Sequence, residues 1–470
     1  MGNRSFAARL QQLFSAHDMT QGAPWKRILE FAIPMLIGNL AQQLYNTADS
    51  IIVGRYVGDN ALAAVGSASP ILNLLLALFV GVATGVGILV AQRYGAKDRE
   101  QLSVVIGNCI TLSAIVSVIT MIIGALITRP MLELLSTPAS IIDWCADYLM
   151  IYFLGIAGFA YYNILSGVLR GMGDSRHPLI FVGVAAVVNI VLDLVFVGVF
   201  HMGAAGAAWA TIAAQALSLT LSIVFLRRRD FVFDFHPRSF KMDKALAGQL
   251  VKLGIPASLQ GTLVSLSFMV LMTVANGVAG LTGSAALSIA GKVNSVAILP
   301  SLAMQASVSS MAGQNIGAGK PERARKTMFV AMGMSFVFSA LMFAVVNLFP
   351  AGIASLFMSG DTDPAIVSAS AEYLRVISWD YLITSILFCI NGLAMGAGQT
   401  LFSLLNGCVS SLLVRIPAAV LFGQVLHFGL NGVGLAAPSA SLVGLVVGVV
   451  YLCTGSWRRA HIKGVPETVS

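Results

Sequence analysis

Three aspartates lie inside long apolar stretches of this sequence: Asp49, Asp193 and Asp380. An ionised carboxylate is costly in an apolar medium unless it faces a partner or water, so such residues usually belong to ion or substrate pathways. The other acidic residues lie in polar segments, at the ends of apolar stretches or in the termini. These three aspartates are therefore the first candidates for chemistry, and the chemistry that they offer is the binding of protons or small cations.

Asp49 closes a polar stripe on the first apolar segment. Asn39, Gln42, Asn46 and Asp49 are spaced by three, four and three residues, which places them on one face of a helix. A polar face is not expected to point toward lipid, so Asn39, Gln42 and Asn46 are candidates for the lining of a substrate cleft.

A second polar pair lies on the fifth apolar segment. Asn189 and Asp193 are four residues apart and share a helix face. At ~1.5 Å per residue, Asp193 lies roughly 9 Å from the outer end of its helix and Thr211 of the next helix roughly 12 Å from that side. Asp49 lies near the outer end of its own helix, so we expect all four side chains to meet in the outer part of one bundle.

Two carboxylates in one site repel each other when both are ionised, and such a pair titrates as a unit. Protonation would remove a charge and let the first helix change its bend or hydration, which would couple a proton to a substrate cleft. A purely structural, hydrogen-bonded acid pair is the alternative interpretation. The second half has no such pair, since Leu271 and Ala418 stand where the first half has Asp49 and Asp193. Ion coupling is therefore expected in the first half only.

Three further ionisable residues within or at the edge of apolar segments are candidates for the cleft: Lys292, Asp380 and Arg415. Lys292 and Asp380 would either line the cleft or pair with each other across the second bundle. Arg415 would either contact cargo or satisfy carbonyl groups at a helix end.

The composition shows which elements must position these residues. The chain has 470 residues, of which 57% are hydrophobic and 10% charged, whereas roughly 25% of residues are charged in soluble domains. A membrane-spanning helix needs roughly 20 apolar residues. Reading the apolar stretches between polar breaks gives twelve segments, which begin near Ile28, Ala61, Gln101, Asp147, Pro178, Gly203, Ala247, Gly283, Ala324, Ser370, Thr400 and Leu430.

The basic residues predict the orientation of these segments. Of the 28 Lys and Arg residues, 23 lie in the two termini and alternate connections, 2 in the opposite connections and 3 within or at the edge of spans. The positive-inside rule then places both termini in the cytoplasm and the chain in the cell (inner) membrane as a multi-pass protein. The amino end has no apolar core, so no cleaved signal peptide is expected.

An internal repeat predicts the architecture. Pro34 and Pro256 match at an offset of 222 residues, Gly167 and Gly392 at 225, and other motifs at offsets up to 226. Because six helices return the chain to its starting side, the two halves are parallel repeats. The sequence predicts an all-α integral membrane protein with twelve transmembrane helices in two six-helix bundles, related by a pseudo-two-fold axis along the membrane normal.

The expected domains follow from the repeat. They are a cytoplasmic amino-terminal segment at 1–26, an N-lobe at 27–226, a basic linker at 227–246, a C-lobe at 247–455 and a cytoplasmic tail at 456–470. Pro34 and Pro256 each lack a backbone donor, so we expect a kink early in the first helix of each lobe. That kink either moves during function or only shapes the packing.

Several other functions are disfavoured. Gly171-Met172-Gly173-Asp174 has the GxGD pattern of intramembrane aspartyl proteases but lies in a basic loop, and no Walker lysine motif occurs. All six histidines lie in loops, at span ends or in termini, and the five cysteines show no metal spacing. We therefore expect no enzyme, no metal, no cofactor and no nucleic-acid partner, and we expect a monomer.

The motifs resemble the multidrug and toxic compound extrusion (MATE) family, from about Trp25 to Trp457. They are Gln43-Leu44-Tyr45-Asn46-Thr47-Ala48-Asp49 with Val53-Gly54, Gly95-Ala96-Lys97 with its repeat Gln314-Asn315-Ile316-Gly317-Ala318-Gly319-Lys320, and Leu169-Arg170-Gly171-Met172-Gly173-Asp174.

The resemblance implies a cation-coupled antiporter that exports amphipathic, often cationic drugs by alternating access. The sequence looks most similar to the DinF-like bacterial branch, which implies a cation site at Asp49, Asp193, Asn189 and Thr211. Helix 7 carries no acid here, unlike a sodium-coupled branch. We thus expect H⁺ as coupling ion, with Na⁺ at the same site as one alternative and a lipid-linked saccharide flippase of the same superfamily as another.

Overall fold

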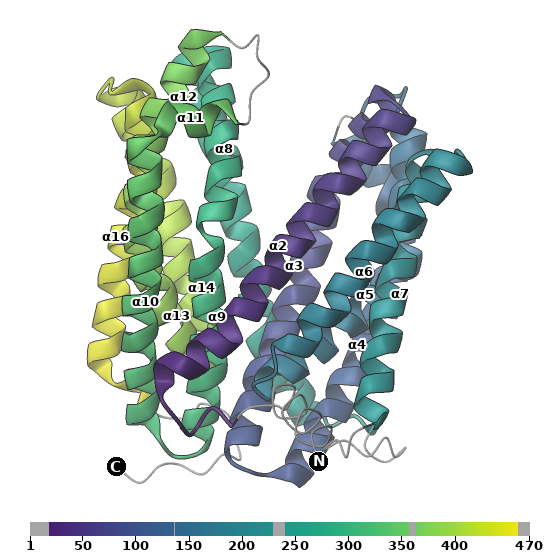
Figure 1. The fold of residues 1–470 in the computed structure, drawn as a ribbon, viewed down its shortest axis with the longest axis vertical. Coiled ribbons are helices and arrows are strands. Elements are labelled where there is room, and N and C mark those ends of the chain that lie inside the picture. The colour runs from purple at the N-terminus through teal and green to yellow at the C-terminus, as the bar shows by residue number, and fades with distance from the viewer. Residues whose placement is uncertain (1–17, 136, 229–239, 357–362, 459–470) are drawn as a thin grey trace, which may run out of the picture. The chain divides into compact units, whose positions relative to one another are not determined.

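The computed structural model describes residues 18–135, 137–228, 240–356 and 363–458 (Figure 1). Parts of the predicted amino-terminal segment, linker and tail, namely 1–17, 229–239 and 459–470, lie outside the described residues. The chain divides into two compact units. The N-terminal unit comprises Ile33–Ile255, and the C-terminal unit comprises Met19–Ala32 and Pro256–Ser470.

The described residues of both units form helices joined by short turns. The N-terminal half of the chain contains α2 (Pro24–Tyr56), α3 (Asp59–Gly95), α4 (Arg99–Leu134), α5 (Ile142–Gly171), α6 (Arg176–Asp193), the π-helix η1 (Leu194–Val199) and α7 (Gly203–Arg228). The C-terminal half contains α8 (Lys244–Ala297), α9 (Leu299–Gly317), α10 (Pro321–Leu348), α11 (Pro350–Ser355), α12 (Pro364–Ile377), α13 (Trp379–Gly396), α14 (Thr400–Cys408), η3 (Val409–Arg415), α15 (Ile416–Val420), η4 (Leu421–Val425), α16 (Gly429–Thr454) and η5 (Ser456–Arg458).

The number of membrane spans agrees with the predicted twelve. Within the described residues, ten helical stretches are long and apolar enough to cross a bilayer. One of them, Lys244–Gly317, contains 74 residues, or roughly 110 Å of helix against a hydrocarbon core of about 30 Å. Its backbone leaves the helical region at Gly280, where φ is 56° and ψ is −137°, so this stretch supplies two spans. The more polar α2 then completes the twelve.

Left-handed backbone positions confirm the internal repeat. A residue with positive φ ends or interrupts a helix, and glycine adopts this conformation most easily. Five such residues in the first half recur in the second half at offsets of 222 to 226. The pairs are Gly58 and Gly280, Lys97 and Gly319, Gly173 and Gly398, His201 and His427, and Gly203 and Gly429. Gly280 therefore separates two spans of the second half, as Gly58 separates α2 from α3.

Matching glycines bring matching helices together in each unit. A Cβ atom at Gly167 of α5 would lie 2.4 Å from the Ala83 carbonyl oxygen of α3. A Cβ atom at Gly392 of α13 would lie 2.6 Å from the Gln305 carbonyl oxygen of α9. Such close backbone approach is the packing that small residues allow between membrane helices. Each unit therefore contains one closely packed helix pair, α3 with α5 and α9 with α13.

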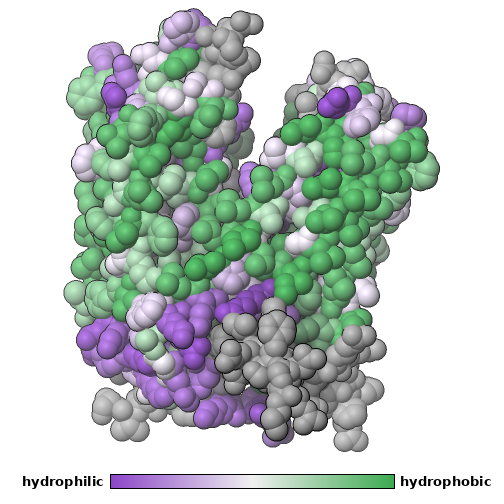
Figure 2. Space-filling model, viewed as in Figure 1, coloured by the Kyte–Doolittle hydropathy of each residue, from purple (hydrophilic) through white to green (hydrophobic). Residues whose placement is uncertain are grey.

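The outer surface of the helices is apolar. Large hydrophobic side chains are widely exposed, among them Leu44 at 70%, Leu126 at 73%, Val337 at 67% and Leu413 at 69%. Figure 2 shows hydrophobic side chains over the middle of the helices and hydrophilic side chains gathered where α9 and α10 meet. Soluble proteins rarely expose apolar patches of this extent. The surface is that of a protein surrounded by lipid.

The first helix of each half begins in the other compact unit. Residues 19–32, including the start of α2, belong to the C-terminal unit, and residues 240–255, including the start of α8, belong to the N-terminal unit. The chain thus changes unit at Ile33 and Pro256, directly beside or at the two predicted kink prolines Pro34 and Pro256. The predicted lobes assign whole helices to one lobe or the other. The compact units instead divide α2 and α8 near their starts.

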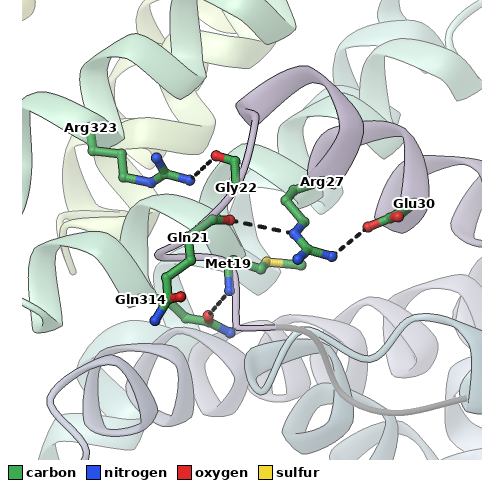
Figure 3. A network of polar contacts seen from close by, with 7 residues as sticks. All are labelled: Met19, Gln21, Gly22, Arg27, Glu30, Gln314 and Arg323. Carbon is green, nitrogen blue, oxygen red and sulfur yellow. Dashed lines mark hydrogen bonds and ion pairs between the residues drawn. The ribbon is translucent and has the colours of Figure 1, made fainter. Parts of the chain in front are cut away.

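Polar contacts hold the amino-terminal segment on α9 and α10 (Figure 3). The Met19 N–H donates to the Gln314 side-chain oxygen at 3.1 Å. The Asn315 side chain donates to the Met19 carbonyl at 3.3 Å. Arg323 donates to the Gly22 carbonyl at 2.6 Å. Gln314 and Asn315 belong to the repeated motif of the sequence. Their structural role is to anchor the chain that leads into α2.

The end of the linker is held in a comparable way on α4. Asn108 accepts a hydrogen bond from the Asp243 N–H at 2.6 Å and donates to the Lys241 carbonyl at 3.4 Å. Thr111 donates to the Phe240 carbonyl at 2.8 Å. Each half of the molecule therefore fixes the segment that precedes the other half's first helix.

Candidate functional site

The structure brings together the four residues that were predicted to form a cation site. Asp49 comes from α2, Asn189 and Asp193 from the end of α6, and Thr211 from α7. All four are buried: Asp193 is 0% exposed, Asn189 1%, and Asp49 and Thr211 8% each. They lie within the N-terminal unit, in spans of mainly apolar sequence. Their geometric association is as expected, while their role in ion coupling stays a prediction.

The two carboxyl groups lie close to each other. The Asp49 and Asp193 side chains are within hydrogen-bonding reach, although neither carboxylate is a donor unless it carries a proton. Asn189 donates from its side-chain nitrogen to the Thr211 hydroxyl at 3.4 Å. The Thr211 hydroxyl donates to the Ala207 carbonyl at 3.0 Å.

The site has an excess of acceptor atoms. Four buried oxygens find no hydrogen-bond donor in the described part of the chain: one oxygen of Asp49, both oxygens of Asp193 and the side-chain oxygen of Asn189. A buried acceptor without a donor is unfavourable by roughly 1–3 kcal/mol. A proton between the two carboxyl groups, or a small cation among the oxygens, would remove that deficit. Among the described residues, no group of three or more His, Cys, Asp and Glu could hold a metal ion.

Two tyrosines of α5 border the acid pair and were not predicted. Tyr148 and Tyr152 are one helical turn apart, with ring centroids 5.1 Å apart. The Tyr152 hydroxyl is within hydrogen-bonding reach of Thr211 and of Tyr148, and both tyrosines interact electrostatically with Asp49. Their spacing of four residues on the face that also carries buried apolar residues was the only sequence signal, and it does not distinguish a site from a core.

The helix that carries Asp193 widens directly after it. The α-helix α6 ends at Asp193, and the next six residues form η1. π-helical turns are rare and frequently occur at functional sites. In the second half, η4 occupies the repeat position of η1, but the residue at the position of Asp193 is Ala418. Local geometry is therefore repeated while the acid is not.

The four residues of the polar stripe on α2 differ in their exposure. Asp49 is buried, Asn39 and Gln42 are half-buried, and Asn46 is exposed. Gln42 lies within hydrogen-bonding reach of Tyr45. The part of α2 that carries these residues lies in the N-terminal unit. The cleft role of Asn39, Gln42 and Asn46 stays a prediction.

The C-terminal unit has apolar residues where the N-terminal unit has the acid pair. Leu271 and Ala418 are buried in its hydrophobic core. Asp380 is buried and accepts a hydrogen bond from Thr384 at 3.1 Å. Lys292 is exposed and forms no ion pair with Asp380, so the predicted pairing alternative is wrong.

Two other features do not belong to this site. A surface groove of about 470 Å³ near α11 and α12 contains Glu372 and Arg375 but none of the predicted site residues. Asp174, the acid of the GxGD pattern, accepts hydrogen bonds from the Arg176 and His177 N–H groups and contacts the His177 ring. Asp174 thus fixes the turn between α5 and α6.

Comparison with known proteins places the chain among membrane transporters. The MatE family model matches residues 34–195 and 256–421. The probable multidrug resistance protein YpnP of Bacillus subtilis is 31% identical over 449 residues, which cover 95% of this chain and 99% of that protein. The probable multidrug resistance protein YoeA of the same organism is 29% identical, with 90% and 92% covered.

The fold is also that of a solved structure. A multidrug resistance MATE family transporter of the MOP superfamily in an outward-facing conformation superposes with a TM-score of 0.88. The two chains are 26% identical, and the match covers 94% of this chain and 98% of that one.

Proposed function

We propose, because this chain belongs to the MatE family of multidrug efflux transporters, that it exports amphipathic organic cations from the cytoplasm in exchange for protons. It is a multi-pass membrane transporter, not an enzyme. The coupling ion and the cargo class are our proposal. The observation that carries it is the buried acid pair of Asp49 and Asp193, in which one oxygen of Asp49 and both oxygens of Asp193 are buried without a donor among the described residues.

The acid pair supports proton coupling for a direct physical reason. Two neighbouring buried carboxylates repel each other when both are ionised. One shared proton replaces this repulsion with a hydrogen bond. Proton binding therefore changes the force between α2 and α6. Because α2 also carries the stripe of Asn39, Gln42 and Asn46, that change would reach candidate cargo contacts on the same helix.

The coupling site belongs to the N-terminal unit only. The C-terminal unit has Leu271 and Ala418 in the matching positions, and neither side chain can bind a proton. A single site couples one ion-binding event to a movement that involves both halves, since alternating access is the general mode of transporters built from repeats. The expected exchange uses this one acid pair per chain.

Flux measurements in proteoliposomes test the proposal. An imposed proton gradient should drive efflux of a fluorescent organic cation by the wild-type protein, and Asp49→Asn or Asp193→Asn should abolish that flux. Asp147→Asn is the matched control, since Asp147 is an exposed acid on α5, next to Tyr148. Full proton-driven flux in both site variants would contradict the assignment of the acid pair.

The alternatives are separated by the same preparation. A sodium gradient applied without a proton gradient should give no flux if protons are the coupling ion, while flux under sodium alone would favour a sodium-coupled antiporter at this site. Movement of a lipid-linked saccharide without either gradient would favour the flippase alternative. That alternative has little support in the sequence, because few cations lie within its spans.

We also propose that both termini lie in the cytoplasm of a cell (inner) membrane and that the protein acts as a monomer. The support for the orientation is the distribution of Lys and Arg, 23 against 2 between the two sides. Reporter fusions at both ends should be active only as cytoplasmic reporters. An externally active fusion at either end would reverse the orientation.

A further inference from the structure

Arg415 is an unpaired charge within the C-terminal unit. It lies in the stretch α14 to η4, which is apolar enough to span a membrane. The side chain is half-buried, and its Nε atom is buried with no hydrogen-bond partner in the part of the chain that the structure describes. No ion pair and no hydrogen bond to a carbonyl joins Arg415 to any described residue. The predicted alternative that Arg415 satisfies helix-end carbonyls is therefore wrong.

The depth of Arg415 separates it from the membrane surface. It follows the start of its span, Thr400, by 15 residues and precedes the end, Val425, by 10 residues. These separations correspond to roughly 22 Å and roughly 15 Å along a helix. A guanidinium this deep, with its Nε turned inward, is not explained by a reach toward lipid headgroups. Charges at such depth are costly and usually functional.

The neighbour of Arg415 on α12 is also unpartnered. Tyr373 interacts electrostatically with Arg415, is 0% exposed, and its hydroxyl has no hydrogen-bond partner among the described residues. An arginine and a tyrosine hydroxyl are both donors. Together they form a local excess of donors, the opposite of the acceptor excess at Asp49 and Asp193.

The nearby acid does not neutralise this donor pair. Asp380 also lies within electrostatic range of Tyr373, but it forms no ion pair with Arg415 and accepts its hydrogen bond from Thr384 instead. Thr384 in turn contacts Ser441 at 3.3 Å. Asp380 is thereby oriented on α13, and the guanidinium stays available. The π-helix η3 ends at Arg415, which is the kind of irregularity found at functional sites.

We propose that Arg415 and the Tyr373 hydroxyl form an anion-binding subsite in the C-terminal unit, which receives the carboxylate of zwitterionic amphipathic cargo. The planar guanidinium matches a carboxylate in shape and charge, and the tyrosine adds one more donor. Asp380 supplies a nearby negative charge for the cationic end of the same molecule. This inference rests on the proposed function and extends its cargo from cations to zwitterions.

A matched pair of dyes tests the subsite. Rhodamine 123 and rhodamine 110 share one fluorescent cation, and they differ because the carboxyl group is a methyl ester in the first and free in the second. Fluorescence anisotropy with the purified full-length protein gives the Kd of each dye. We expect Arg415→Gln to raise the Kd of rhodamine 110 by roughly 10- to 100-fold, as for the loss of a charge-assisted bidentate contact. The Kd of rhodamine 123 should change by less than about 2-fold, because its ester offers no charge to the guanidinium.

Two more conservative variants show whether a change in Kd comes from the lost contact or from misfolding of the protein. Tyr373→Phe removes only one oxygen and should weaken rhodamine 110 by roughly 3- to 10-fold, again without affecting rhodamine 123. Arg415→Lys should give an intermediate Kd, since lysine keeps the charge but not the fork. Arg375→Gln removes an exposed arginine of α12 that lies in the surface groove outside the site, and it is the matched control; it should alter neither dye selectively.

The outcomes distinguish this inference from the proposed function. Equal changes for both dyes in Arg415→Gln, or no selective change in Tyr373→Phe, would overturn the subsite. Wild-type binding of rhodamine 123 without rhodamine 110 would also overturn it and leave the antiporter proposal intact. If the wild-type protein bound neither dye and moved neither under a proton gradient, the proposed cargo class itself would fail.

Discussion

Asp380 and Asp193 are both buried aspartates in spans, yet their surroundings differ. Asp193 has a second carboxyl as its neighbour and no donor among the described residues, whereas Asp380 has the Thr384 hydroxyl as a donor. The Thr384 hydroxyl satisfies one oxygen of Asp380, whereas the facing oxygens of the acid pair have only a proton or a small cation to satisfy them. The two residues should therefore contribute to different steps of transport.

Substitution of Asp380 should change which compounds are carried. In Asp380→Asn we expect the susceptibility of cells to shift by several-fold among test cations, because a negative charge beside the proposed cargo subsite is lost, while a proton gradient still drives flux. The measurement compares a panel of cationic compounds in growth assays with pH-driven flux of one dye. Glu372→Gln, an exposed acid on the neighbouring helix, is the control. Loss of pH-driven flux for every compound would instead place Asp380 in the coupling step.

The sequence predicted that Asp49, Asn189, Asp193 and Thr211 meet, because Asn189 and Asp193 share a helix face and all four residues lie at similar depth. Their role as a cation site stays a prediction. It did not predict Tyr148 and Tyr152, since tyrosine serves equally in cores and in sites. It also left the surroundings of Lys292 and Arg415 open. Helical spacing places a residue on a face, but the neighbour of that face depends on how the helices pack.

The helix α5 borders the acid site and packs closely against α3. α5 carries Tyr148 and Tyr152, and it approaches α3 so closely at Gly167 that no side-chain atom fits there. Hydropathy predicted the starts of α7 and α14 at Gly203 and Thr400, where these helices begin, but it placed the start of α12 at Ser370 instead of Pro364. The π-helices η1, η3 and η4 were not predicted, since their hydrogen-bond pattern leaves no compositional trace.

Adding a methyl group at Gly167, where α5 and α3 are in close contact, should destabilise the protein. In Gly167→Ala the new methyl group would meet the Ala83 carbonyl oxygen at 2.4 Å, so the helices must separate at a cost of roughly 1–3 kcal/mol. Thermal unfolding of the purified protein should show a lower Tm. Gly183→Ala on α6, where nothing lies within 4 Å, should leave Tm unchanged or raise it slightly. Equal Tm values for both variants would contradict the packing argument.

The internal repeat organises the whole molecule, and it was visible in the sequence as offsets of 222 to 226 residues. The structure adds that five left-handed positions recur at the same offsets. It also shows what counting helices does not reveal: α2 and α8 each begin in one compact unit and continue in the other. Contacts made by short connecting segments decide this assignment, and hydropathy carries no information about such contacts.

The two prolines at these changes of unit should matter for movement more than for binding. Pro34→Ala and Pro256→Ala restore a backbone donor and stiffen the helix at the point where the chain passes between units. We expect turnover to fall by roughly 3-fold or more, as for a hinge residue, with the Kd of a cationic dye within about 2-fold of wild type. Pro70→Ala inside α3, which lies entirely in the N-terminal unit, is the control. Unchanged turnover in both variants would make the kinks static.

The reciprocal exchange of helix starts bears on how the polypeptide can be divided. A cut between 228 and 240 separates the halves by sequence, yet each fragment would keep a piece whose binding partners lie in the other: Met19 would leave Gln314 and Asn315, and Asp243 would leave Asn108. Each product would therefore lack the hydrogen-bond partners of its own exchanged segment, and we expect the two products to be more stable together than apart.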